Sequence, residues 1–191
     1  VLGLSIYNGL RRAGGDFDYT ILTCGGFTEL AERSGVSAYP IPREDENELS
    51  RDRCRGSVLY SVLQDLSPDI LIVDLSWFTL HHFIEELPCK KIFLCRMLSD
   101  AGFTIPLPGG PLVFDPSRYD RLFAIEPFRS SIPMEMLNPI ILRNRDEIMS
   151  RNEALFRLSE AGIHPESGDS RICLFAFNGK PGEFEEIKKM Y

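Results

Sequence analysis

Short apolar runs alternate along this chain with stretches in which apolar residues recur at helical spacing. Two stretches place apolar residues on one helix face: Leu2, Ile6 and Leu10, and then Val58, Val62 and Leu66. The pair Gly14-Gly15 ends the first stretch, so a helix is expected to open the chain. Further helices are predicted at 27–33, 57–66, 77–87 and 147–161, and strands at 17–24, 36–41, 70–75, 91–95, 119–125 and 140–142.

The clearest predicted strands are apolar runs rather than patterns that alternate apolar and polar residues. Residues 70–75 (ILIVDL) and 91–95 (KIFLC) are the clearest, and a helix is expected between them. Continuous apolar runs that alternate with helices are typical of parallel strands with both faces covered. We therefore expect an α/β fold with a doubly wound, mostly parallel sheet, in which 21–22, 70–73 and 92–94 belong to central strands.

The organisation along the chain predicts one domain and the start of another. Residues 1–162 are expected to form a Rossmann-like domain, in which a strand should precede the opening helix, and 96–119 is irregular because it is rich in proline and glycine. A polar linker follows at 163–170. The apolar run 172–177 and the helix after it then make 171–191 the first strand–helix unit of a second α/β domain.

Composition narrows the class of protein. The chain has 191 residues and a formal net charge of -7, which argues against nucleic acid or an anionic membrane surface as its main partner. Its five cysteines form no C-x-x-C pair, and some of them lie in apolar runs, so a reduced, cytoplasmic protein is the simplest interpretation. The apolar runs are far shorter than the ~20 residues that span a bilayer.

Candidate site residues follow from the fold class. Ligands of open α/β sheets bind beyond the carboxyl ends of the strands, where the loops converge. This rule selects polar, glycine and aromatic residues that directly follow predicted strands: Gly25, Gly26, Asp74, Ser76, Trp77, Arg96, Ser99, Asp100, Glu126, Asn178, Gly179 and Lys180. The carboxylates Asp74 and Glu126 are the best placed of these for acid or base chemistry.

Several of these residues have a structural interpretation beside the functional one. Arg96 is either an anion contact or a partner of Asp100 or Asp74, and Trp77 either offers an exposed apolar face to a ligand or caps the core. Gly25 and Gly26 form either a plain turn or a close approach to a ligand.

Two further features of the sequence also have more than one interpretation. The loop at 178–182 (NGKPG) is either a tight turn or a phosphate cradle, because it lacks the spacing of the known glycine-rich loops. For His81 and His82 we expect that one faces the core or a neighbouring loop and the other faces water.

A family resemblance rests on the order of five sequence segments: residues 10–42 (LRRAGGDFDYTILTCGGFTELAERSGVSAYPIP), SPDILIVDLSW, KKIFLCRMLSD, YDRLFAIEPF and ICLFAFNGKPGEF. Their order resembles the amino-terminal half of GT-B glycosyltransferases, in particular the MurG-type N-acetylglucosaminyl transferases and the bacterial predicted glycosyltransferases. In that family the amino-terminal domain binds the acceptor, the carboxy-terminal domain binds a nucleotide sugar, and catalysis occurs between them.

The resemblance implies roles for the candidate residues. Acceptor binding is implied for Asp74, Ser76, Trp77, Arg96, Ser99 and Asp100, donor binding for Asn178, Gly179 and Lys180, and other cleft positions for Gly25, Gly26 and Glu126. It implies no cofactor or metal ion and leaves the catalytic base unassigned, since the loop that often supplies the base in the family has no counterpart in this sequence. A lipid-linked acceptor would bring the protein to a membrane surface.

Three function classes follow. The first is transfer of a glycosyl group from a nucleoside diphosphate sugar to an acceptor hydroxyl. The second is a sugar-nucleotide hydrolase or epimerase of the same architecture, and the third is a non-catalytic binding module. The resemblance favours the first, with this chain alone expected to be inactive.

Overall fold

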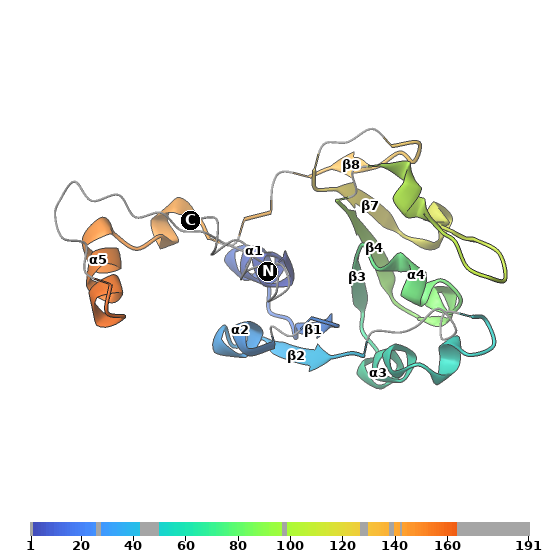
Figure 1. The fold of residues 1–191 in the computed structure, drawn as a ribbon, viewed down its shortest axis with the longest axis horizontal. Coiled ribbons are helices and arrows are strands. Elements are labelled where there is room, and N and C mark those ends of the chain that lie inside the picture. Colours follow the sequence, from blue (N-terminus) through green and yellow to red (C-terminus); the bar gives the residue numbers. More distant parts are fainter. Residues whose placement is uncertain are drawn as a thin grey trace, which may run out of the picture. The chain divides into compact units, whose positions relative to one another are not determined.

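A computed structural model describes residues 2–25, 28–42, 50–96, 99–126, 130–137, 140–141 and 143–163 (Figure 1). The chain divides into two compact units, Val1–Arg143 and Asn144–Tyr191. This division falls ahead of the linker predicted at 163–170. Except for residue 163, that linker and the unit predicted at 171–191 lie outside the described residues.

The main sheet has four parallel strands in the order β3-β4-β7-β8. They are β3 (Ile70–Asp74), β4 (Lys90–Cys95), β7 (Arg121–Ala124) and β8 (Glu135–Met136). The prediction of an α/β fold with a mostly parallel sheet is thereby confirmed at this level. The two most apolar runs of the sequence became β3 and β4, which pair along their whole common length, with Val73 opposite Phe93.

Among the residues that the structure describes, a second sheet pairs two parallel strands, β1 (Thr20–Thr23) and β2 (Ser37–Pro40). It is flanked by α1 (Leu2–Arg12) and α2 (Thr28–Arg33), which confirms both predicted helices. The prediction that 21–22 and 70–73 belong to central strands is wrong for the described residues, because β1 pairs with β2 alone and β3 is an edge strand of the main sheet. Residues 92–94 lie in β4, an interior strand, as predicted. Strand pairing is a long-range property that an apolar run does not encode.

The helix predicted at 57–66 is α3 (Val58–Leu66), which follows a 3-10 turn at Cys54–Gly56. Ser57 caps it, because its hydroxyl accepts a hydrogen bond from the Tyr60 N–H at 3.1 Å. The buried face differs from the predicted one. It is formed by Leu59, Val62 and Leu63, while Val58 and Leu66 are exposed, so the face is rotated by about one residue from the predicted stripe.

The helix predicted at 77–87 is shorter in the structure. It consists of α4 (Trp77–Leu80), a turn, and a 3-10 helix at Ile84–Glu86. The backbone leaves the helical region at Phe83, whose φ is -133°. Phe83 and Ile84 both become fully buried at this break, so core packing outweighed the helical spacing of the sequence.

The segment predicted to be irregular contains a small antiparallel ribbon, formed by β5 (Thr104–Ile105) and β6 (Leu112–Val113). Short 3-10 helices flank the ribbon at Asp100–Phe103 and Pro116–Arg118. The strand predicted at 140–142 is wrong for Ile140 and Ile141, which lie outside any strand, and residue 142 is outside the described residues.

The second unit contains a 3-10 turn at Arg145–Glu147 and the helix α5 (Arg151–Glu160). The helix starts later than predicted, at the Ser150 cap, and Gly162 follows it with a φ of +79°, a conformation that favours glycine. The start is set by Ser150, whose hydroxyl accepts a hydrogen bond from the Glu153 N–H at 3.2 Å.

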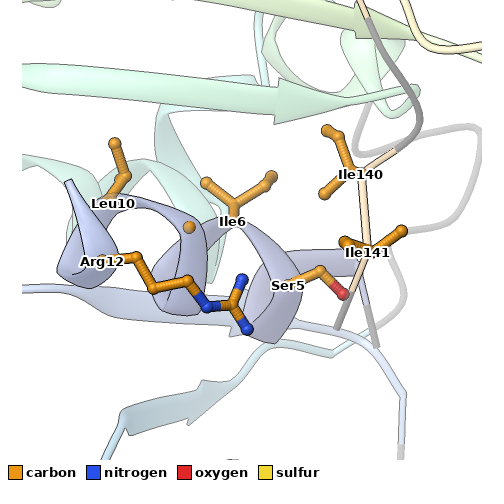
Figure 2. A pocket seen from close by; sticks show the side chains of 7 residues that line it. Ser5, Ile6, Leu10, Arg12, Ile140 and Ile141 are labelled. Carbon is orange, nitrogen blue, oxygen red and sulfur yellow. The ribbon is translucent and has the colours of Figure 1, made fainter. Parts of the chain in front are cut away.

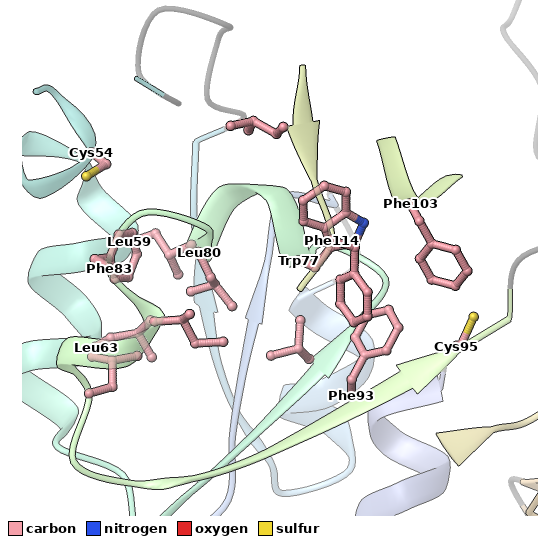
Figure 3. Packing of buried hydrophobic residues seen from close by; sticks show 14 residues of the cluster. Cys54, Leu59, Leu63, Trp77, Leu80, Phe83, Phe93, Cys95, Phe103 and Phe114 are labelled. Atoms are coloured by element: carbon pink, nitrogen blue, oxygen red, sulfur yellow. The ribbon is translucent and has the colours of Figure 1, made fainter. Parts of the chain in front are cut away.

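Two separate hydrophobic clusters hold the first unit together. The larger one lies around β3, β4, α3 and α4, and Figure 3 shows Trp77, Phe93 and Phe114 grouped within it. The smaller one has only Leu4, Ala31 and Val36 as fully buried members, with partly buried residues of β1 and β2 packed against them. The small sheet also contributes to the larger cluster, because Leu22 of β1 and Ile41, which follows β2, pack against it.

Candidate functional site

An arginine–aspartate pair lies at the carboxyl edge of the main sheet. Asp74 is the last residue of β3, and Arg96 directly follows β4. Arg96 donates two hydrogen bonds to the Asp74 carboxylate, from Nε to Oδ1 at 3.1 Å and from Nη2 to Oδ2 at 3.3 Å. The adjacent parallel strands thus bring the two loops together as the sequence predicted, and the partner of Arg96 is Asp74 rather than Asp100.

This pair is accessible from solvent. The Arg96 side chain is 46% exposed and that of Asp74 34%. The planar guanidinium binds carboxylates and phosphates with the same two-pronged geometry, so an anionic ligand can replace Asp74 as its partner. An exposed ion pair contributes only about 0–1 kcal/mol to stability. Replacing Asp74 by a ligand anion as the partner of Arg96 would therefore cost the fold little stability.

Leu75 follows Asp74 in an unusual backbone conformation. Its φ is +61°, in the left-handed region that bulky residues rarely adopt. Hydrogen bonds hold the turn: the Leu75 N–H donates to the Leu94 carbonyl at 3.3 Å, and the Trp77 N–H donates to the Leu75 carbonyl at 2.7 Å. Such strain occurs preferentially at functional sites, and no sequence signal marks it here. The turn leaves Ser76 exposed directly beside the pair.

Trp77 is buried, and the prediction of a partly exposed indole is wrong. Only 2% of the residue is exposed. Its Nε1–H donates to the Gly102 carbonyl at 3.1 Å, and its ring lies edge-on to Phe114 at 5.5 Å. The segment after β4 folds over the indole and satisfies its only donor, so Trp77 belongs to the core and offers no face to a ligand.

Asp100 connects two loops at the same end of the sheet. Its two carboxylate oxygens accept from the Ser131 N–H, at 3.2 Å and 3.0 Å. Since Asp100 follows β4 and Ser131 follows β7, this contact holds the two loops together. Ser99 and Glu126 are exposed next to these loops, and the Ser99 carbonyl accepts from the Gly102 N–H at 3.3 Å within the loop that carries Asp100.

Gly25 lies in a turn after β1. Its N–H donates to the Thr23 hydroxyl at 3.0 Å, so that donor is already engaged within the turn. This contact favours the plain-turn interpretation for Gly25. Gly26, Asn178, Gly179 and Lys180 lie outside the described residues.

Tyr19 is a residue near the pair that sequence reasoning missed. Burial and the negative charge of Asp74 raise the pKa of its phenol to about 12, which keeps the hydroxyl protonated at neutral pH. The hydroxyl donates to the Gly3 carbonyl at 3.1 Å. Tyr19 precedes its strand, so the rule that selects residues after strands could not have found it.

His81 and His82 are both half-buried, one turn beyond Trp77. Their rings lie edge to face at 4.8 Å, and the His81 ring also contacts Trp77. Burial and the neighbouring Arg118 lower the pKa of both imidazoles. His81 is the one whose ring lies against Trp77 of the main cluster, and both imidazoles remain partly exposed.

Two grooves lie away from the pair. One, of about 330 Å³, is lined by α1 together with Ile140 and Ile141, which Figure 2 shows beside that helix. The other, of about 440 Å³, lies around Arg121, whose side chain is paired with Glu135. Neither groove contains a predicted site residue.

Searches for metal sites and membrane spans gave no candidates in the part of the chain that the structure describes. No group of three or more histidine, cysteine, aspartate or glutamate side chains there could hold a metal ion. None of the helices there is long and apolar enough to cross a bilayer.

Comparisons with known proteins leave the family open. No protein-family model matches the sequence, and neither a curated protein nor a solved structure is significantly similar to it.

Proposed function

We propose that this chain is the acceptor-binding part of a GT-B-like glycosyltransferase, which transfers a glycosyl group from a nucleoside diphosphate sugar to an acceptor hydroxyl. The observation that carries the proposal is the exposed Arg96–Asp74 pair at the carboxyl edge of a parallel sheet. Ligands of open α/β sheets bind at that edge. The family resemblance of the sequence supports the same assignment.

The pair offers complementary chemistry to an acceptor. The Asp74 carboxylate accepts hydrogen bonds, as sugar hydroxyls require, and the Arg96 guanidinium donates two parallel hydrogen bonds to a phosphate or carboxylate of the acceptor. Ser76, exposed beside the pair, adds a hydroxyl that both donates and accepts. In this proposal the buried Trp77 positions the loop and does not touch the ligand.

The donor site in this proposal lies with Asn178, Gly179 and Lys180 and with further residues of a donor domain. The 191-residue chain should therefore bind acceptor-like glycosides weakly and nucleotide sugars very weakly, and should show no turnover.

An NMR titration tests the assignment. Octyl β-D-glucuronide, a glycoside that carries a carboxylate, serves as the acceptor probe below its micelle concentration, and UDP-N-acetylglucosamine serves as the donor probe. The glucuronide should shift the amide signals of Asp74, Ser76 and Arg96 in a saturable manner, and Arg96→Ala should weaken this binding about tenfold, in line with the loss of charge-assisted hydrogen bonds to the carboxylate.

Arg121→Ala is the matched control, because Arg121 forms an exposed ion pair with Glu135 in the same sheet, at the start of β7. It should leave the titration unchanged. Tight binding of the nucleotide sugar by this chain would contradict the division of roles. Glucuronide shifts that Arg96→Ala does not alter would remove the pair from the site.

A further inference from the structure

We propose that the histidine pair His81–His82 is a pH sensor for the candidate site. Protonation of the two rings loosens the turn at 74–77, and acceptor binding then weakens. The effect on acceptor binding rests on the proposed function, whereas the effect on the turn does not. The inference follows from a strained residue in the turn, from the tryptophan that holds it, and from the charges around the two histidines.

The turn at 74–77 depends on its surroundings for its shape. Leu75 has a φ of +61°, a conformation that a leucine keeps only where neighbouring contacts impose it. One of these contacts is the hydrogen bond that the Trp77 N–H donates to the Leu75 carbonyl at 2.7 Å. When the packing of Trp77 weakens, Leu75 can return to a negative φ, and Asp74 and Ser76 on either side of it then change direction. The turn therefore has a second arrangement, and Trp77 decides between the two.

Trp77 connects this turn to the histidines. Its indole is buried, donates to the Gly102 carbonyl at 3.1 Å and lies edge-on to Phe114 (Figure 3). The His81 ring contacts the same indole from one helical turn further along the chain, with 5.9 Å between the ring centroids. A change of charge at His81 therefore acts directly on the side chain that holds the strained turn.

The surroundings of the pair favour neutral rings. The rings of His81 and His82 lie edge to face at 4.8 Å, so two protonated rings would repel each other. Arg118 donates a hydrogen bond to the His81 carbonyl. Burial and the charge of Arg118 lower the pKa of both histidines, and Arg51 adds a further positive charge beside His82.

Two carboxylates face His81 and oppose this effect. Asp115 directly precedes the 3-10 helix that carries Arg118 and pairs with that arginine at 3.2 Å, and Glu85 approaches it at 3.8 Å. Both carboxylates raise the pKa of His81, but burial and the positive neighbours prevail. With both rings protonated, the charges of Arg118 and the two imidazoles outnumber these two carboxylates. Acid should therefore move the pair away from its present position against Trp77.

NMR of the full chain without ligand tests the sensor. The Leu75 Cα signal, which depends on the backbone angles, should shift between about pH 7.5 and about pH 5 with the same midpoint as the His81 ring signals. Glu85→Gln removes a carboxylate that raises the pKa of His81, so both midpoints should move to lower pH. The amide signals of β4 show that the chain stays folded.

Two histidine variants provide the controls. The double variant His81→Gln, His82→Gln should show no shift at Leu75. His164→Gln removes the third histidine of the chain and should respond to pH like the original protein. A Leu75 signal that stays constant while His81 titrates, or a shift that persists in the double variant, would overturn the proposal.

A titration with octyl β-D-glucuronide tests the effect on the site. Its Kd should be about fivefold higher or more at about pH 5 than at about pH 7.5, and the double variant should bind equally at both. The carboxylate of the probe stays ionised in this range, because carboxylic acids titrate near about pH 4. By reciprocity, bound glucuronide should move the His81 midpoint to lower pH, which a purely structural histidine would not show.

The two readouts separate the sensor from the proposed function. A Leu75 signal that follows pH in a chain that binds no glucuronide would support the sensor and refute the acceptor site. Glucuronide binding that is equal at both pH values, in a chain whose Leu75 signal shifts, would overturn the control of the site by the histidine pair.

Discussion

The two sheets of the first unit differ in how their strands are stabilised. The main sheet has four strands and a large core that extends from α3 to the ribbon β5–β6. The small sheet has two strands, and its fully buried residues are Leu4, Ala31 and Val36. Because two strands alone are marginal, the small sheet depends on α1 and α2, and we expect it to open locally while the main sheet stays folded.

The largest effect should come from Phe93→Ala in the main sheet. Phe93 is completely buried, and its ring lies 4.6 Å from that of Phe114 and 5.4 Å from that of Tyr119. Removing it should lower the free energy of unfolding by about 3–5 kcal/mol, since the cavity would open at the centre of the cluster. Urea denaturation measures this loss.

Phe156→Ala is the control for that loss. Phe156 lies on α5 of the second unit and is 60% exposed, so its removal should change the free energy of unfolding by less than about 0.5 kcal/mol. A loss below about 1 kcal/mol for Phe93→Ala would mean that the main cluster is not the stable centre of the unit.

Leu4→Ala tests the small sheet. Leu4 is buried on the inner face of α1, and its removal should cost about 2–3 kcal/mol of local stability. Hydrogen exchange should accelerate at residues 20–23 and 37–40 and stay unchanged in β4. Leu10→Ala, on the exposed face of the same helix, should have little effect. Equal acceleration in β4 would show that the two sheets unfold as one unit.

The sequence predicted β3, β4 and β7 of the main sheet, because their signal is local, and it did not predict β8. The runs ILIV and IFLC are apolar without interruption, and each lies in a strand at nearly the predicted residues. The partner of β1 was not predictable, because pairing depends on residues far away in the sequence. The helix predicted at 77–87 had the correct spacing, but burial of both Phe83 and Ile84 ended it early.

In the candidate site, too, some features could be predicted from the sequence and others could not. The meeting of Asp74 and Arg96 was predictable, since both follow neighbouring parallel strands. The burial of Trp77 was not, because Gly102 and Phe114, which enclose it, lie 25 and more residues further along the chain. The left-handed backbone of Leu75 has no sequence signal at all, because leucine is not a residue that favours it.

A smaller effect is expected at Leu75, in the turn that directly follows β3. Glycine adopts a φ of +61° without strain, whereas alanine does not. Leu75→Gly should therefore be more stable than Leu75→Ala by about 1 kcal/mol, the reverse of their order in a helix. Both variants lose the same leucine contacts, so their difference isolates the backbone. The two variants are compared by their urea denaturation midpoints. An alanine variant as stable as the glycine variant would show that the backbone at residue 75 is not strained.

The smallest effect concerns pH and should appear in the main sheet alone. Burial, Arg118 and His82 lower the pKa of His81 below its ordinary value of 6.5, while Asp115 and Glu85 oppose the shift. Above pH 6.5 the histidine is neutral in both the folded and the unfolded chain, and this contribution to stability is complete. As the pH falls below 6.5, the unfolded chain takes up the proton first, so stability decreases until the pH reaches the lower pKa of the folded protein.

His81→Gln removes this titration while keeping a polar side chain. The variant should lose less stability than the original chain between about pH 7 and about pH 5, measured as the urea midpoint at each pH. Because the His81 ring contacts Trp77 in the main cluster, the difference should appear in the hydrogen exchange of β4, and the exchange of β1 should be the same in both proteins. Parallel stability curves for the two proteins would show that His81 titrates alike in the folded and unfolded chains.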